Sequence, residues 1–119
     1  MMRSLGEFEQ LLLFAVLRLG DDAYGARIRQ EIEERTGRSV SAGAVYTGLD
    51  RLEQRGLVAS REGEATPVRG GRRKRYYRLE PRGAASLSET WENVTGMANG
   101  VLSRLRELAA TWSEGAEGR

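Results

Sequence analysis

The sequence contains neither cysteine nor histidine among its 119 residues. The missing cysteine excludes disulfides, thiolate metal sites and cysteine nucleophiles. The missing histidine excludes histidine-dependent catalytic triads and zinc motifs, which leaves carboxylates, lysine, serine and tyrosine for any chemistry. The sequence places no pair of residues together that could serve as catalytic acid and base, so we predict a protein that is not an enzyme and needs no cofactor.

Long apolar runs are also missing. The apolar stretch from Leu11 to Leu17 is far shorter than the roughly 18 residues of a membrane span, and no small-residue cleavage site follows it. Hydrophobic residues make up 39% of the chain and charged residues 30%, which is typical of a folded domain. We expect one compact cytoplasmic domain without a membrane partner, with about one helix to spare for another protein chain.

Positive charge is modest overall but locally concentrated. The formal net charge is +2, and residues 1–60 carry eight cations against nine anions, whereas residues 61–82 carry eight against three. The excess is centred on the stretch GGRRKRYYRL, from Gly70 to Leu79. Such a run indicates either a solvated loop or a surface that grips an acidic partner.

Apolar spacing and glycine punctuation predict three helices in the first half of the chain. These are residues 5–19, 23–35 and 42–55, each followed by a glycine that can end a helix. Asp21 and Asp22 are candidate caps for the second helix. The first helix is apolar on more than one side, so it needs more neighbours than a small domain offers.

From Leu57 onward the apolar period changes to that of strands. The segments LVASR and RRKRYYRL flank a turn-rich stretch and predict a β-hairpin, with Tyr77 and Leu79 toward the core and Tyr76 and Arg78 on the other face. Three helices followed by a basic hairpin match a winged helix-turn-helix, a DNA-binding arrangement, which we assign to residues 1–80.

The last part of the chain has the clearest periodicity. Its apolar residues alternate in steps of four and three: Leu87, Trp91, Val94, Ala98, Val101, Leu105, Leu108 and Trp112. A helix from Pro81 to Trp112 would be about 48 Å long at ~1.5 Å per residue, more than the small domain can cover. We therefore predict that residues 81–119 form a dimerisation helix, within which Gly96 and Gly100 permit close helix approach or a bend.

The predicted fold class is mainly α with a small β-hairpin: a winged helix-turn-helix plus a long C-terminal dimerisation helix. The runs GAVYTGLDRLEQRGLV (Gly43 to Val58) and GGRRKRYYRLEPRG (Gly70 to Gly83), with the pair Tyr24-Gly25, closely resemble the PadR family of bacterial transcriptional regulators. The resemblance covers nearly the whole chain and favours the short subgroup with a single C-terminal helix. One departure is Glu80, where the family usually has threonine.

The resemblance implies a homodimeric repressor that binds a two-fold symmetric operator in double-stranded DNA. The C-terminal helix of each chain would pack on the first helix of the partner. The expected dimer contacts are Phe8, Leu12, Trp91, Val94, Ala98, Val101, Leu105 and Leu108.

The expected DNA contacts lie at the third helix and on the hairpin, which acts as the wing. They are Ser39, Ser41, Ala42, Tyr46, Thr47 and Arg51, and on the wing Arg72, Arg73, Lys74 and Arg75. Two alternatives stay open: Tyr46 could pack beneath the wing, and Arg51 could form an ion pair with Asp50 or near Glu53.

Trp91 raises the question of a small-molecule effector. In multidrug-responsive members of the short subgroup, a tryptophan at the matching position faces its symmetry mate across an apolar pore. By this resemblance Trp91, with Leu87 and Thr95, could hold a planar hydrophobic ligand whose binding relieves repression. The tryptophan could equally close the dimer interface. The competing function is a winged-helix module for protein contacts that has no effector.

Overall fold

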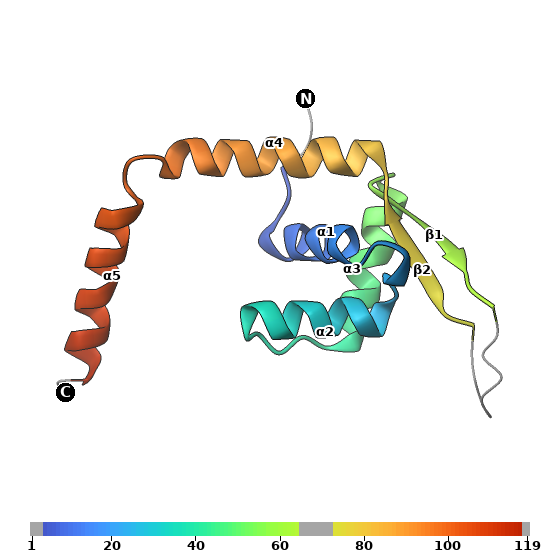
Figure 1. Cartoon of the computed structure of the whole chain (residues 1–119), viewed down its shortest axis with the longest axis horizontal. Helices are drawn as coiled ribbons and strands as arrows, with labels where there is room; N and C mark the ends of the chain where they lie inside the picture. The colour runs from blue at the N-terminus through green and yellow to red at the C-terminus, as the bar shows by residue number, and fades with distance from the viewer. Residues whose placement is uncertain (1–3, 65–72, 118–119) are drawn as a thin grey trace. The chain divides into compact units, whose positions relative to one another are not determined.

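The computed structural model describes residues 4–64 and 73–117, and these fall into two compact units divided between Ser88 and Glu89. In the first unit, helices α1, α2 and α3 pack against one another, and the hairpin β1–β2 projects from them (Figure 1). Among the described helices, none is both long and apolar enough to cross a membrane.

Helix α1 spans Glu7–Leu19 and begins two residues later than the apolar spacing predicted. The reason is a local cap, since the carboxylate of Glu9 accepts a hydrogen bond from the backbone N–H of Gly6 at 2.8 Å. The helix ends at Gly20, whose φ of 55° is easily reached only by glycine. Its buried side chains form the centre of the hydrophobic core: Leu12, Leu13, Ala15 and Val16.

Helix α2 spans Gly25–Thr36, and neither predicted aspartate caps it. Asp21 and Asp22 instead lie in a short 3-10 turn, and Tyr24 precedes the helix without a side-chain cap. The start is delayed because the segment before it is extended and pairs with the hairpin, where the Tyr77 N–H donates to the carbonyl of Ala23 at 2.8 Å. This single bridge, between Tyr24 and Tyr76, was not visible in the sequence pattern.

Helix α3 spans Ala42–Gln54, close to the predicted bounds. The hydroxyl of Ser41 caps it by accepting a hydrogen bond from the Ala44 N–H at 3.1 Å. Val45, Leu49 and Leu52 are fully buried at helical spacing, so one side of the helix is committed to the core. The opposite side, at the start of the helix, is exposed.

Strands β1 (Val58–Glu62) and β2 (Arg75–Leu79) pair antiparallel, from Val58 opposite Leu79 to Glu62 opposite Arg75. Tyr77 is buried and Leu79 packs against the core, which confirms the predicted faces. The strand begins only at Arg75, so Arg73 and Lys74 precede it.

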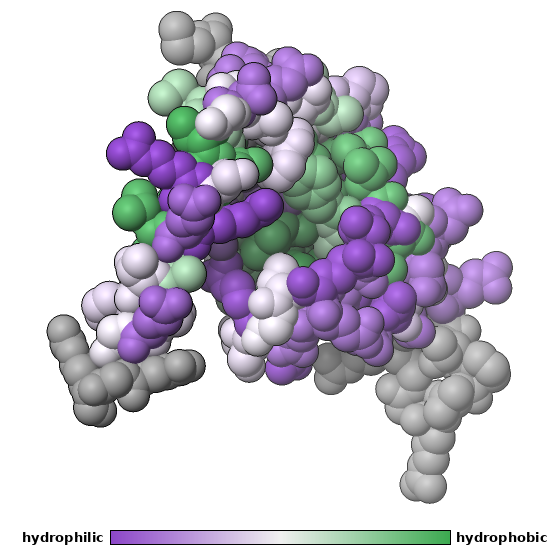
Figure 2. All heavy atoms as spheres, turned by 60° about the vertical axis from the view of Figure 1, so that its left-hand side comes forward, coloured by the Kyte–Doolittle hydropathy of each residue, from purple (hydrophilic) through white to green (hydrophobic). Residues whose placement is uncertain are grey.

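The C-terminal helix is not continuous, which corrects the prediction of one helix to Trp112. Helix α4 spans Pro81–Ala98 and α5 spans Leu102–Glu117. Between them Gly100 has a φ of 85°, a conformation that ends a helix. The apolar repeat in the sequence continues past this break. In the C-terminal unit the apolar side chains remain open to solvent, with Trp91 54% and Trp112 74% exposed. Figure 2, coloured by hydropathy, shows hydrophobic residues at the surface among hydrophilic ones.

Candidate nucleic-acid interface

The first turns of α3 present small polar side chains to solvent. Ser39, Ser41, Ala42 and Thr47 are all exposed, as a helix entering a DNA groove requires. The Ser41 oxygen also caps the helix, so its hydroxyl proton remains available to donate to another acceptor.

Tyr46 lies against the start of α2. A Cβ atom at Gly25 would lie 2.5 Å from the Tyr46 hydroxyl oxygen, so the tyrosine ring rests directly on the glycine backbone. The side chain is nevertheless 47% exposed. Together with α2 it borders a groove of about 220 Å³, whose lining residues are Gly25, Ala26, Arg29, Gln30, Glu33, Ala42 and Tyr46.

The segment between α2 and α3 is held by side chains that the sequence analysis did not single out. Arg29 donates from Nε to the carbonyl of Val40 at 2.7 Å, and Glu33 accepts from the Val40 N–H at 3.1 Å. Because both backbone groups of Val40 are bound, the residues on either side of it are presented in one conformation. These neighbours are the two serines predicted to contact DNA.

Arg51 is exposed, and across the described residues no ion pair engages it. Glu53 instead accepts hydrogen bonds from the N–H and the hydroxyl of Ser60, at 3.2 and 2.7 Å. The alternative of an ion pair for Arg51 is therefore not seen among the described residues, and a phosphate contact by Arg51 stays a prediction.

The described cations of the wing differ in how they are held. Arg73 and Arg75 pair with Glu62 at 3.7 and 3.9 Å, in ion pairs that are at least half exposed. Arg75 also donates to the hydroxyl of Ser60 at 3.0 Å. The Nζ of Lys74 instead lies 4.1 Å from the centroid of an aromatic ring on a different segment. Of the four predicted wing cations, Arg72 lies outside the described residues.

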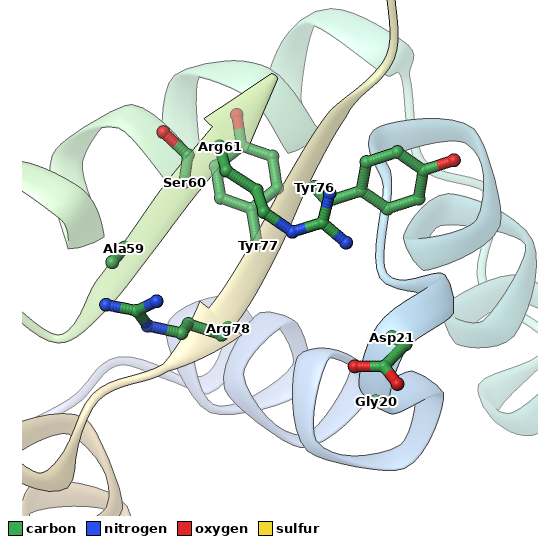
Figure 3. A pocket seen from close by; sticks show the side chains of 8 residues that line it. All are labelled: Gly20, Asp21, Ala59, Ser60, Arg61, Tyr76, Tyr77 and Arg78. Atoms are coloured by element: carbon green, nitrogen blue, oxygen red, sulfur yellow. The ribbon is translucent and has the colours of Figure 1, made fainter. Parts of the chain in front are cut away.

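A small opening of about 210 Å³ lies between the hairpin and the turn after α1, and Figure 3 shows the side chains around it. The Arg61 guanidinium is turned toward the Tyr76 ring, 4.7 Å from its centroid. Burial raises the pKa of the Tyr77 hydroxyl, and the charge of Asp50 adds to the effect, so this tyrosine stays neutral. Tyr77 is therefore an anchor for the hairpin rather than a titrating group.

Two residues predicted to contact a partner or an effector are instead buried inside the protomer, and the structure corrects both assignments. Leu12 has no exposed surface and packs where a side chain on Gly48 would overlap it. Leu87 is 4% exposed and belongs to the core of the first unit. Helical spacing marked both positions correctly as apolar but did not say which neighbour covers them. Phe8 is partly buried.

The remaining predicted interface residues lie in the C-terminal unit. Ala98 is partly buried, and the other members are exposed: Trp91, Val94, Thr95, Val101, Leu105 and Leu108.

Comparison with known proteins identifies the family. The profile of the "Transcriptional regulator PadR-like family" matches residues 13–89. Transcriptional regulator Rv3488 of Mycobacterium tuberculosis is 38% identical over 82 residues, which cover 69% of this chain and 72% of the relative. The crystal structure of a PadR family transcription regulator from Clostridium difficile is 26% identical, covers 80% of this chain and 98% of that chain, and superposes with a TM-score of 0.60.

The structure of H. salinarum RosR shows the same fold, with a TM-score of 0.64, 23% identity and 98% coverage of both chains. The solved structures confirm the mainly α fold with a winged helix-turn-helix and a two-stranded hairpin, and relatives such as Rv3488 are transcriptional regulators rather than enzymes. The chain belongs to the PadR-like family of transcriptional regulators, which bind DNA.

Proposed function

We propose that the protein is a homodimeric repressor that binds a two-fold symmetric operator through α3 and the wing of each protomer. One observation carries the proposal: the ring of Tyr46 from α3 rests on Gly25, and Lys74 from the wing rests on the adjoining Tyr24. The helix that would enter the major groove and the cations that would bind phosphate are therefore held by one dipeptide. We expect the protein to act in the cytoplasm, because its proposed partner is DNA.

In this proposal α3 reads bases while the wing supplies affinity. Serine and threonine hydroxyls at the start of α3 would donate to or accept from base edges, and Ala42 would contact a thymine methyl group. Arg51, one turn later, would reach a phosphate. The wing cations would neutralise phosphates without choosing among sequences.

The dimer would form because apolar surface is left uncovered in each unit. A groove of about 260 Å³ lies between α1 and α2, floored by Leu11, Phe14, Ala15 and Ile32 and edged by Arg18, Glu31, Arg35 and Thr36. The C-terminal unit exposes large apolar side chains on both of its helices and on the turn between them: Trp91 and Val94 on α4, Val101 in the turn, and Leu105, Leu108 and Trp112 on α5. We propose that apolar side chains of this unit on one chain cover the groove on its partner.

We also propose that a small-molecule effector binds at the same interface. Trp91 and Thr95 are exposed one turn apart on α4, where a planar hydrophobic ligand could stack on the indole. Ligand binding would change the separation of the two α3 helices, which must lie about one DNA turn apart (~34 Å) to dock. Tryptophan fluorescence with a panel of planar aromatics tests this, and no quenching by any of them contradicts it.

DNA binding is tested by fluorescence anisotropy with a labelled duplex from the promoter region beside the gene, at increasing salt. If each protomer neutralises about three phosphates, log K falls with log salt at a slope near −5. Replacing Arg73 and Lys74 by alanine removes about four phosphate contacts per dimer and brings the slope to about −2. Replacing Arg104 and Arg106 instead, exposed cations of α5, makes the same change in charge and should leave the slope unchanged.

The competing function, a winged-helix module for acidic proteins, predicts a different result. The intact protein would then bind the duplex weakly, and the wing and control variants would behave alike. Either finding contradicts the proposed function.

A further inference from the structure

Four side chains at the base of the wing form a continuous stack of cations and rings. The Nζ of Lys74 lies 4.1 Å from the centroid of the Tyr24 ring, and the Tyr24 ring meets the Tyr76 ring edge-on, with centroids 5.6 Å apart and an interplanar angle of 72°. The Arg61 guanidinium covers the Tyr76 ring at 4.7 Å. Three of the four residues belong to the hairpin or the loop beside it, and only Tyr24 comes from the segment that begins α2.

The backbone supports this stack on both sides. Tyr24 and Tyr76 form an antiparallel bridge, and the Gly63 N–H donates to the carbonyl of Lys74 at 2.6 Å. A side chain at Gly63 would overlap the Tyr76 ring, so the ring also closes against the end of β1. The aromatic pair therefore lies where the edge of the hairpin meets the helices.

The ring of Tyr24 holds Lys74 in a way that leaves its binding groups available. A cation over a ring face is attracted by the ring quadrupole, but its N–H donors are not consumed as they are in an ion pair. Arg73 and Arg75, by contrast, are partly neutralised by Glu62. A lysine side chain also has many rotamers, so a free lysine loses much conformational entropy when it binds a phosphate. A lysine already restrained by a ring loses less.

We propose that Tyr24 is a positioning residue, which holds Lys74 at a fixed place relative to α3 so that the wing binds a phosphate in register with that helix. The inference deepens the proposed function and rests on it. The register follows from the chain itself, because the residue after Tyr24 is Gly25, on which Tyr46 of α3 rests. One dipeptide thus relates the proposed phosphate contact of the wing to the helix that would read bases.

The test is a double-mutant cycle on the full-length protein, measured by anisotropy with the same duplex. A cation–π contact at an exposed site contributes about twofold to fivefold per protomer, so Tyr24→Leu should weaken binding of the dimer by about four- to twenty-five-fold. Tyr24→Phe keeps the ring face and should bind like the unmodified protein. With Lys74→Ala already present, Tyr24→Leu should change the dissociation constant by less than about twofold, because no cation is left to position.

Four outcomes overturn this inference alone. The loss in Tyr24→Leu is as large with Lys74→Ala as without it, which indicates a general packing role. Tyr24→Phe binds as weakly as Tyr24→Leu. Tyr24→Leu tightens binding, which indicates that the ring sequesters the lysine. Tyr24→Leu binds DNA as well as the unmodified protein does. Failure of the unmodified protein to bind DNA overturns the proposed function as well.

A second comparison does not depend on the folding of a Tyr24 variant. Lys74→Met and Arg73→Met each remove one exposed cation of the wing and keep an apolar stem. Because Arg73 is paired with the Glu62 carboxylate while Lys74 lies over the Tyr24 ring, Lys74→Met should weaken binding more than Arg73→Met does. Equal losses, or a larger loss for Arg73→Met, contradict the proposed role of Tyr24.

Discussion

Glu62 is the acidic residue that most directly opposes the proposed DNA contacts, and replacing it by glutamine should tighten binding. Its carboxylate pairs with Arg73 at 3.7 Å and with Arg75 at 3.9 Å. When the wing approaches a phosphate, these pairs must open or share their cations with a new anion, while the carboxylate repels the DNA. Glu62→Gln removes both the competition and the repulsion and keeps the size of the side chain.

The magnitude follows from the exposure of the two ion pairs. Exposed pairs contribute up to about 1 kcal/mol, so releasing the cations should improve binding by about 0.5–1 kcal/mol per protomer. For a dimer with two wings this is about 1–2 kcal/mol, or about a five- to thirtyfold lower dissociation constant at low salt. The gain should shrink as salt rises, because exposed charges are screened. The stability of the free protein should fall by less than about 1 kcal/mol.

Anisotropy titrations at two salt concentrations, with thermal melting of the free protein, measure both effects. Glu107→Gln on α5 is the matched control, since it removes the same charge from an exposed helix outside the wing. Unchanged or weaker binding of Glu62→Gln would refute the reasoning, as would an equal gain in the control. The first result would show that Arg73 and Arg75 do not face phosphate.

Three further predictions concern the supports of the site. Gly25→Ala should displace the ring of Tyr46 and destabilise the fold by about 1–3 kcal/mol in chemical denaturation, with weaker DNA binding; an unchanged midpoint contradicts the close contact. Glu53→Ala removes the acceptor for both groups of Ser60 and should cost about 1–3 kcal/mol, read from the same denaturation curves, and a neutral result would exclude this link between α3 and the wing. The Arg35 guanidinium donates a hydrogen bond to Glu31 and thereby lowers the pKa of the Glu31 carboxyl group. The stability that this pair contributes is present above the ordinary pKa of 4.5 and is lost as pH falls below it. Melting from pH 7 to 3 should therefore show a smaller acid loss for Glu31→Gln, and an identical loss speaks against the assignment.

The helix ends and the faces of the hairpin were predictable because they depend on local physics. Gly20, Gly37 and Gly56 all have positive φ, which is the property that made them readable as helix ends. The alternation that placed Tyr77 in the core is a property of any strand with one buried face. The exposed start of α3 followed in the same way, since the positions that face the core were marked by their spacing.

Contacts between distant segments were not predictable from periodicity. Tyr24 delays the start of α2 because it pairs with a strand some fifty positions later, and nothing in its neighbourhood in the sequence records that partner. Three other contacts were missed for the same reason, because their partners lie on different segments. They are the link between Glu53 and Ser60, the carboxylate of Glu62 beside two wing cations, and the aromatic ring under Lys74. Each becomes visible only when the hairpin is placed beside the helices.

Apolar spacing also left two questions that it could not decide. The heptad pattern of apolar residues continues through the residues around Gly100, so this spacing alone did not indicate that α4 and α5 are separate helices. The left-handed conformation of Gly100 marks the point where they separate. The same spacing marked Leu12 and Leu87 as interface candidates although the protomer itself buries them. A periodic pattern identifies which residues need cover, whereas the source of the cover depends on the tertiary structure.

In the proposed complex, two copies of α3 and its wing dock on one face of a DNA duplex. Hydroxyl-radical footprinting of the bound promoter fragment measures this arrangement. We expect two protected patches on each strand, related by two-fold symmetry and centred about one helical turn apart (~34 Å). A single protected patch, or a pattern without two-fold symmetry, would contradict it.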